Sequence, residues 1–428
     1  MDRSILKDLL AWKAKPRRKP LIIDGARQVG KTWAMKHLAK EYFESFVYIN
    51  FDHPDYLDYH KIFSSGYGPQ RIVELIEFES GIHITPGQTL LIFDEIQEVP
   101  AALTGLKYFR EEMPEQHIIC AGSQMGMALH RGTSFPVGNV ETIKMLPMSF
   151  TEFLAATGDA KYAKVLADSR LDMIVPLHQR FLELLKTYMF VGGMPEVVQH
   201  YSDGESFDVI RELQQQLLDN FRADFSKHAP AALISKLNLV WDSVPVQLAK
   251  ENKKYIWSVI RKGARASEFE NAIQWLQDCG LIHKVPHLAS PELPLAAHAS
   301  PDIFKIYGLD IGLLAAQAGV SAKMIMDGSG VYSEFKGTLA EQFALQEMKH
   351  RHKRLYYWTG GTSEIDFVLQ AGEEVVPIEV KSGENLQAKS LRAYQDKYHP
   401  AIAYKLSLLP YRVNEVVTNL PLYLANQI

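Results

Sequence analysis

Apolar residues between positions 20 and 150 fall in short runs that are separated by stretches with helical spacing. The runs that predict strands are Leu21–Asp24, Phe46–Phe51, Thr89–Phe93, Ile118–Ala121 and Glu141–Leu146. Strands that alternate with helices in this way are typical of a parallel sheet covered by helices. The pattern therefore predicts an α/β domain over residues 1–155.

The spacing of apolar residues changes twice further along the chain. From about Ser149 to Lys284 they recur at helical intervals, as in Phe181–Tyr188 and Phe269–Leu276. After about Asp302, a helical stretch precedes three apolar runs that predict consecutive strands, namely Gly337–Lys349 and then Leu355–Trp358, Ile365–Leu369 and Val375–Val380. We therefore expect a mainly helical middle domain over 156–300 and a second α/β domain over 301–428.

Composition excludes several classes of protein. The 428 residues carry a net charge of −4, so no broad basic surface for nucleic acid is expected. Two cysteines, Cys120 and Cys279, are too few for a disulfide framework or a cysteine-based zinc site. The N-terminus lacks the apolar core of a secretory signal, and no apolar stretch approaches the ~18–20 residues of a membrane span. These features predict a soluble cytoplasmic protein without membrane contact.

The strongest motif follows the first predicted strand and opens a helix. It is a complete GxxxxGK[ST] pattern, formed by Gly25, Ala26, Arg27, Gln28, Val29, Gly30, Lys31 and Thr32. In such a loop, backbone N–H groups turn inward around phosphate, and the helix N-terminus adds positive partial charge. We expect Lys31 to reach the β- and γ-phosphates of a nucleotide and Thr32 to bind Mg²⁺. A simple glycine turn before a helix is the alternative.

A second motif supports the nucleotide site. The apolar run Leu90–Phe93 ends in Asp94 and Glu95, a Walker B arrangement. Asp94 would hold Mg²⁺ and Glu95 would orient and activate the attacking water, although an acidic pair at a strand end is often only solvated. Ser123 follows the next strand and is a candidate γ-phosphate sensor, with an ordinary cap as the alternative.

The segment Lys250–Arg265 is locally basic. It carries six basic residues against Glu251 and includes Tyr255 and Trp257, which we interpret as core anchors. The helix predicted over Ala266–Gly280 and the short strand after it are compatible with a winged helix, which would contact DNA phosphates. A solvated face on a lid explains the same residues equally well.

Together these motifs resemble the AAA-type P-loop ATPases that carry a C-terminal domain of unknown function. Further markers of the resemblance are Phe135–Val140, Pro147–Phe153 and Val191–Glu196. The resemblance implies a RecA-like sheet that uses ATP and Mg²⁺, together with subunit assembly. One position departs from it, because Asn139 stands where Lys or Arg is usual. An arginine finger is therefore unassigned, and Arg131 is the nearest remaining candidate.

Polar residues in the C-terminal part resemble those of the restriction-endonuclease-like, PD-(D/E)xK fold. They are Glu341, Asp366, Glu379, Lys381 and Gln395. Glu379 and Lys381 lie two apart and so share one face of a strand, where a carboxylate can bind a metal and an ammonium can face phosphate. Asp366 would complete the metal site and Glu341 would support it. A cross-strand ion pair explains the Glu-x-Lys spacing without any catalysis.

Two classes of function fit these observations, and a degenerate nucleotide-binding protein without turnover is a third alternative because of Asn139. The first is a Mg²⁺-dependent ATPase that governs a nuclease-like domain acting on DNA. The second is an ATP-controlled switch that docks a protein partner through a nuclease-like domain without activity. Residues 331–428 carry 11 basic and 11 acidic residues, so the domain lacks the positive surface of a committed duplex binder.

Overall fold

The computed structural model describes residues 3–122, 135–250, 254–327, 333–383 and 389–428. Within these residues the chain forms two compact units, which we describe separately. The first unit extends to Leu146 and includes Asp278–Gly280; the second comprises Pro147–Gln277 and Leu281–Ile428. No helix in the described part of the chain is long and apolar enough to cross a membrane.

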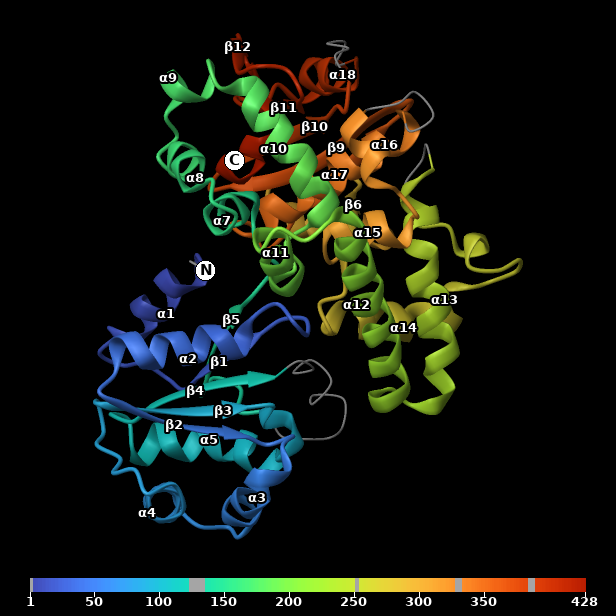
Figure 1. The fold of residues 1–428 in the computed structure, drawn as a ribbon. Coiled ribbons are helices and arrows are strands. Elements are labelled where there is room, and N and C mark those ends of the chain that lie inside the picture. Colours follow the sequence, from blue (N-terminus) through green and yellow to red (C-terminus); the bar gives the residue numbers. More distant parts are fainter. Residues whose placement is uncertain (1–2, 123–134, 251–253, 328–332, 384–388) are drawn as a thin grey trace. The chain divides into compact units, whose positions relative to one another are not determined.

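A five-stranded parallel sheet forms the centre of the first unit (Figure 1). Its strands are β1 (Leu21–Asp24), β2 (Ser45–Asn50), β3 (Thr89–Asp94), β4 (His117–Gly122) and β5 (Glu141–Lys144). They follow the order β2-β3-β4-β1-β5. The predicted parallel sheet is confirmed, with strand limits that differ by at most two residues. The continuous apolar run of β3 fits its place inside the sheet, where every residue is buried.

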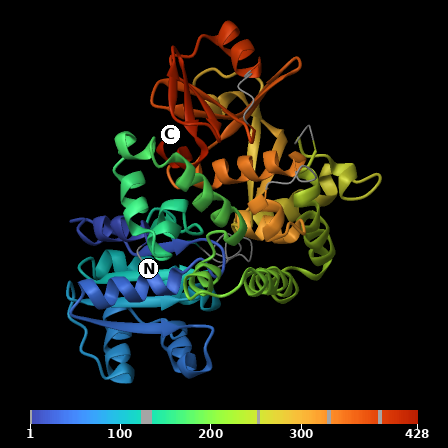
Figure 2. The same cartoon turned by 45° about the horizontal axis from the view of Figure 1, so that its top comes forward.

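Helices cover the sheet of the first unit on both faces. They are α1 (Ile5–Lys13), α2 (Lys31–Tyr42), η1 (Pro54–Tyr56), α3 (Leu57–Ser64), α4 (Pro69–Ser80), η2 (Ile96–Glu98) and α5 (Pro100–Glu112). Helices α3 and α4 lie on the opposite side of the sheet from α2 in Figures 1 and 2. On that side, Leu91 and Phe93 of β3 share one apolar core with Leu103 and Leu106 of α5. This core fixes the carboxyl end of β3.

The second unit begins with helices. They are α7 (Phe150–Ala156), α8 (Ala160–Ala167), α9 (Leu171–Ile174), α10 (His178–Val191), α11 (Pro195–Ser202), α12 (Phe207–His228), α13 (Ala231–Leu248), η3 (Trp257–Val259) and α14 (Ala266–Asp278). The helices predicted around Phe181–Tyr188 and Phe269–Leu276 are confirmed as α10 and α14. Tyr255 is buried and stacks on Phe304, which confirms it as a core anchor.

The remainder of the second unit combines a mixed eight-stranded sheet with further helices. Its elements are β6 (Ile282–Leu288), η4 (Leu295–His298), β7 (Ala299–Gly308), α15 (Ile311–Gln317), α16 (Ala322–Asp327), α17 (Ser333–Lys349), β8 (Tyr356–Gly360), β9 (Ser363–Ala371), β10 (Glu374–Val380), α18 (Lys389–Tyr398), β11 (Ala403–Ser407), β12 (Arg412–Asn414), β13 (Val417–Pro421) and η6 (Leu422–Gln427). The predicted helix and three strands are confirmed as α17, β8, β9 and β10.

The sheet of the second unit joins segments from both sides of residue 300. Its order is β12-β13-β11-β10-β9-β8-β6-β7, and β6 pairs in parallel with β8. The predicted middle and C-terminal domains therefore contribute to one sheet. The three domains over 1–155, 156–300 and 301–428 stay a prediction, because the division into two units does not test their limits.

Buried polar contacts anchor the start of α7 within the second unit. The Met148 amide donates to the Gly193 carbonyl at 2.7 Å, and the Gly193 amide donates to the Asp310 carboxylate at 2.6 Å. A Cβ atom at Gly193 would lie 2.1 Å from the Met148 carbonyl oxygen, so only glycine fits. The Phe150 amide donates to Glu347 Oε1 at 2.8 Å. These contacts join the segments Pro147–Phe153 and Val191–Glu196 within the second unit.

The buried Glu347 gives an expected pH dependence. Burial raises the pKa of Glu347 to about 8, and Oε2 has no hydrogen-bond partner among the described residues. A carboxyl group with a raised folded-state pKa stabilises the fold below its unfolded pKa of ~4.3, and this contribution is lost as pH rises through 8. We expect Glu347→Gln to unfold at nearly the same urea concentration as wild type near pH 4.5, and to be more stable by on the order of 5 kcal/mol at pH 8.5.

Urea titrations of the full chain at several pH values, followed by tryptophan fluorescence, measure this difference. The exposed Glu373→Gln is the matched control and should follow the wild-type curve. Parallel curves for wild type and Glu347→Gln would show that Glu347 ionises normally in the fold.

Candidate functional site

The glycine-rich loop lies between the end of β1 and the start of α2. Gly25 has φ +150°, and a Cβ atom there would lie 2.2 Å from the Met145 carbonyl oxygen, just after β5. A larger residue would have to displace this backbone. The loop therefore passes tightly over the end of the sheet, and α2 presents its N-terminus there because Lys31 is its first residue. A helix N-terminus after such a loop favours bound anions.

Lys31 is buried against the loop. Its side chain Nζ donates to the Gly25 carbonyl at 2.8 Å and to the Ala26 carbonyl at 2.7 Å. Burial lowers the pKa of Lys31, while Glu95, Asp24 and Asp94 act in the opposite direction. The ammonium group is thus held at the base of the loop and close to carboxylates at two strand ends. Its position agrees with the phosphate-binding role predicted for it, which remains a prediction.

Asp94 links the loop helix to the sheet. It is buried at the end of β3, where its Oδ2 accepts hydrogen bonds from Thr32 Oγ1 at 2.6 Å and from the Tyr48 hydroxyl at 3.0 Å. Burial raises the pKa of Asp94, and the hydrogen bond from Thr32 opposes this shift. The two residues predicted to bind Mg²⁺, which lie in separate motifs, are therefore in direct contact.

Glu95 occupies a strained backbone position beside Asp94. Its φ of 50° lies in the left-handed region, which non-glycine residues rarely adopt and which is often maintained at functional sites. The side chain is half-buried, and its Oε2 accepts a hydrogen bond from Gln97 Nε2 at 2.6 Å. Its carboxylate is therefore oriented by a neighbour next to the Asp94 carboxylate.

The donors at this site fit Mg²⁺ bound with a nucleotide. Mg²⁺ prefers oxygen ligands and usually keeps several waters, together with one or two protein groups and substrate phosphates. The touching oxygens of Thr32 and Asp94 provide such a pair. No group of three or more His, Cys, Asp or Glu side chains suited to a metal occurs within the described ranges. A nucleotide-linked Mg²⁺ does not need such a group, because phosphate oxygens complete its ligands.

Sequence reasoning missed two residues of this site. Tyr48 on β2 donates to Asp94, and Lys36 Nζ lies 3.7 Å from the centroid of the Tyr48 ring. Asp24 at the end of β1 is half-buried; burial raises its pKa, and Lys144 and Lys31 oppose this shift. Asp24 could have been identified from the sequence, since it immediately precedes the glycine-rich loop. Tyr48 could be identified only from the pairing of β2 with β3, which sets Asn50 opposite Asp94.

Two of the predicted nucleotide-site residues, Ser123 and Arg131, lie outside the described residues. The strand before Ser123 is confirmed and ends at Gly122. Asn139, where the family pattern has a basic residue, accepts a hydrogen bond from Arg110 through its side-chain oxygen. The same guanidinium donates to the Gly138 carbonyl at 3.0 Å. The assignment of an arginine finger stays open.

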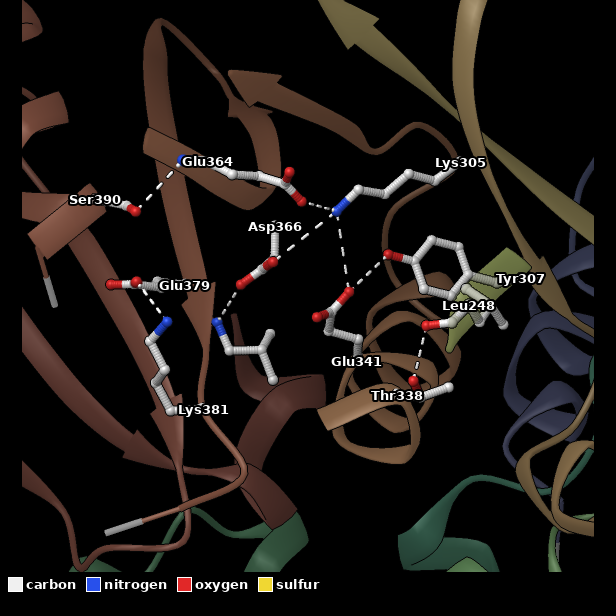
Figure 3. Close-up of polar contacts among 11 residues, drawn as sticks. Leu248, Lys305, Tyr307, Thr338, Glu341, Glu364, Asp366, Glu379, Lys381 and Ser390 are labelled. Atoms are coloured by element: carbon white, nitrogen blue, oxygen red, sulfur yellow. Dashed lines mark hydrogen bonds and ion pairs between the residues drawn. The ribbon is translucent and has the colours of Figure 1, made fainter. Parts of the chain in front are cut away.

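The predicted C-terminal residues do not form one cluster. Two of them lie near Lys305, a lysine that the motif did not include (Figure 3). Lys305 of β7 is completely buried and its Nζ contacts Glu364 Oε1. Asp366 Oδ1 lies 3.9 Å from the same nitrogen, and Glu341 Oε2 lies 4.0 Å from it. Glu341 belongs to α17, whereas Glu364 and Asp366 lie two apart on β9 and share one face. Glu341 and Asp366 are therefore brought together around an ammonium group.

Glu379 and Lys381 form an ion pair with each other. Lys381 Nζ lies 2.8 Å from Glu379 Oε1, and Glu379 is opposite Lys405 in the pairing of β10 with β11. Gln395 lies on α18, and the described hydrogen bonds do not join it to either group. The role predicted for Gln395 remains a prediction. Lys305 and Glu364 were missed, although a lysine inside the apolar run of β7 was a visible signal.

The basic segment before α14 is partly paired. Arg261 lies 3.0 Å from Glu268 of α14, and its guanidinium lies over the Phe269 ring. Lys253 lies outside the described residues. This pairing reduces the positive charge available to phosphate on this segment, and DNA contact stays a prediction.

Comparisons with known proteins cover most of the chain. Residues 17–154 match a family model described as an AAA domain. Residues 182–324 and 336–424 match two models described as Domain of unknown function (DUF8612) and Domain of unknown function (DUF4143). No curated protein matches the sequence. Among solved structures, the Walker-type ATPase PABY2304 of Pyrococcus abyssi matches with 14% identity and a TM-score of 0.45, over 74% of this chain and 95% of that chain. Residues 17–154 are thus an AAA-type ATPase-like domain, followed by two regions that match families of unknown function.

Proposed function

We propose that this protein binds ATP with Mg²⁺ at the loop 25–32 and hydrolyses it to ADP and phosphate. The observation that carries the proposal is the 2.6 Å contact between Thr32 and Asp94. These residues come from two motifs with different chemical roles, and the fold brings their oxygens to one point beside Lys31. A structural cap would not require a buried lysine, a hydroxyl and a carboxylate at the same place.

Each group at the site has a separate role in this proposal. The loop amides and Lys31 bind the phosphates and compensate their negative charge. Thr32 and Asp94 hold Mg²⁺, which when bound neutralises charge on the β- and γ-phosphate oxygens. Glu95 accepts a proton from the attacking water and orients it toward the γ-phosphate. Ser123 is proposed as the residue that contacts the γ-phosphate.

For the C-terminal domain we retain the restriction-endonuclease-like fold as a proposal. The order of α17, three antiparallel strands, α18 and a further strand supports it, as does the parallel pairing of β10 with β11. Helix α14 followed by the β6–β7 hairpin supports a winged-helix-like middle region. The small number of cysteines, both of them buried, supports a reducing, cytoplasmic location. Binding of DNA, binding of a protein partner and self-association stay proposals.

Single-turnover hydrolysis tests the proposal. The full chain in excess over γ-labelled ATP is expected to release labelled phosphate with Mg²⁺ and to release none in EDTA. Adding duplex DNA at low and at high salt distinguishes DNA from a protein as the partner. An effect of DNA on hydrolysis should weaken steeply as salt rises, because phosphate contacts do so. Absence of both ATP binding and hydrolysis in Mg²⁺ would refute the proposed function.

A further inference from the structure

The carboxylates of the nuclease-like site surround a cation that the protein itself provides. Lys305 has no exposed surface, and its ammonium group faces Glu341, Glu364 and Asp366 (Figure 3). The Tyr357 ring lies 4.9 Å from the same nitrogen and adds a cation–π contact. Burial disfavours the charged form of this lysine, but the three carboxylates outweigh that effect and raise the pKa of Lys305 above its usual range.

Oxygens beside Lys305 are already engaged, whereas Glu379 Oε2 is buried and has no hydrogen-bond partner among the described residues. Asp366 Oδ2 accepts a hydrogen bond from the Val380 amide at 2.7 Å, and Asp366 Oδ1 faces Lys305. Glu341 Oε2 accepts a hydrogen bond from the Tyr307 hydroxyl at 3.1 Å. A Mg²⁺ ion would need direct oxygen contacts at about 2.0–2.1 Å and near-octahedral space. The buried ammonium group occupies the position where these carboxylates converge.

A second ammonium group, that of Lys381, lies near this cluster (Figure 3). Lys381 is paired with Glu379, and its pKa is raised by that pairing and by Asp366 and Glu341, against the effect of burial. A divalent ion between Glu341 and Asp366 would therefore be close to two positive charges in a largely buried environment, where charge repulsion is poorly screened. The residues around Lys305 therefore do not fit a divalent metal ion.

We infer that Lys305 takes the place of a divalent cation between Glu341 and Asp366, so that the C-terminal domain binds no metal ion at these two carboxylates. The ammonium group instead ties β7 to α17 and β9 within one ionic cluster. This inference does not depend on ATP hydrolysis at the loop 25–32.

The inference predicts that removing Lys305 creates a cation site. Without the ammonium, Glu341, Glu364 and Asp366 form an uncompensated oxygen cluster, which favours a hard divalent ion. We expect Lys305→Ala to bind one additional Mn²⁺ ion at least tenfold more tightly than the parent protein. Adding Asp366→Asn should abolish the gain. Lys284→Ala is the matched control, because Lys284 lies on the neighbouring β6 but faces Asp302 and Glu270 instead.

Electron paramagnetic resonance of free Mn²⁺, measured without nucleotide, provides the titration. All proteins would be full-length and carry Asp94→Asn, so that the loop site does not contribute. Two results would overturn the inference: Mn²⁺ binding by the parent protein that Asp366→Asn removes, or a folded Lys305→Ala protein that gains no Mn²⁺. If Lys305→Ala fails to fold, as judged by circular dichroism, Lys305→Met is titrated in its place. If neither variant folds, the titration of the parent protein tests the inference by itself. Nicking of supercoiled DNA by wild type that is lost in Asp366→Asn would also overturn it.

Discussion

ATP affinity is expected to fall by roughly 100-fold or more when Lys31 is replaced by alanine, because a buried charge-assisted phosphate contact is worth a few kcal/mol. Lys31 is the cation held directly against the loop carbonyls, and Asp24, Asp94 and Glu95 lie close enough to influence its pKa. Without the ammonium group, a triphosphate would meet these carboxylates uncompensated. Equilibrium titration with a fluorescent ATP analogue in Mg²⁺ measures the change.

Lys40→Ala is the matched control for this substitution. Lys40 lies in the last turn of the same helix, is exposed, and is distant from the loop in sequence. It should leave ATP affinity unchanged, and circular dichroism should show that both variants fold. An unaltered affinity in a folded Lys31→Ala protein would remove the loop 25–32 from the account of nucleotide binding.

Glu95→Gln is expected to slow ATP hydrolysis without weakening ATP binding. The amide keeps the shape of the side chain but cannot accept a proton, and loss of a general base typically costs about 10²–10⁴ in rate. We expect kcat to fall by roughly that factor, while ATP affinity changes by less than about threefold because the substitution removes no direct phosphate ligand. The split between rate and affinity distinguishes a base from a residue that only supports the loop.

Glu98→Gln provides the comparison for Glu95. Glu98 lies three residues further on in η2, and its amide donates to the Glu95 carbonyl, so it shares the local backbone without reaching Asp94 through any described hydrogen bond. It should retain wild-type rate and affinity. If Glu95→Gln hydrolyses ATP at the wild-type rate, the water must be activated by another group.

The arrangement of the loop 25–32 and of the Walker B acid could be predicted from the sequence because both are local features, whereas the roles assigned to their residues stay predictions. The strand limits, the loop and the first helical residue lie within one short stretch, and β1 has the predicted bounds Leu21–Asp24. The Walker B acid follows a buried strand whose apolar run is equally clear. The contribution of Tyr48 was not predictable, because the register of β2 against β3 depends on tertiary packing.

The C-terminal site shows the limit of motif reasoning. The motif named Glu341 and Asp366, and both carboxylates lie near Lys305 Nζ, a group that was not part of the motif. Lys305 is distant from both in the sequence and reaches them only because the β6–β7 hairpin joins the sheet through β8. A buried lysine within an apolar run signals an ionic partner, but the pattern alone does not identify which acids provide it.

The most direct test of the central claim is a crystal structure of the full chain with Mg²⁺ and a non-hydrolysable ATP analogue. We expect the phosphates to lie against the amides of residues 26–31, Lys31 to move from the loop carbonyls to a phosphate oxygen, and Mg²⁺ to be held by Thr32 and Asp94. An analogue bound elsewhere, or a loop that excludes it at saturating concentration, would contradict the account.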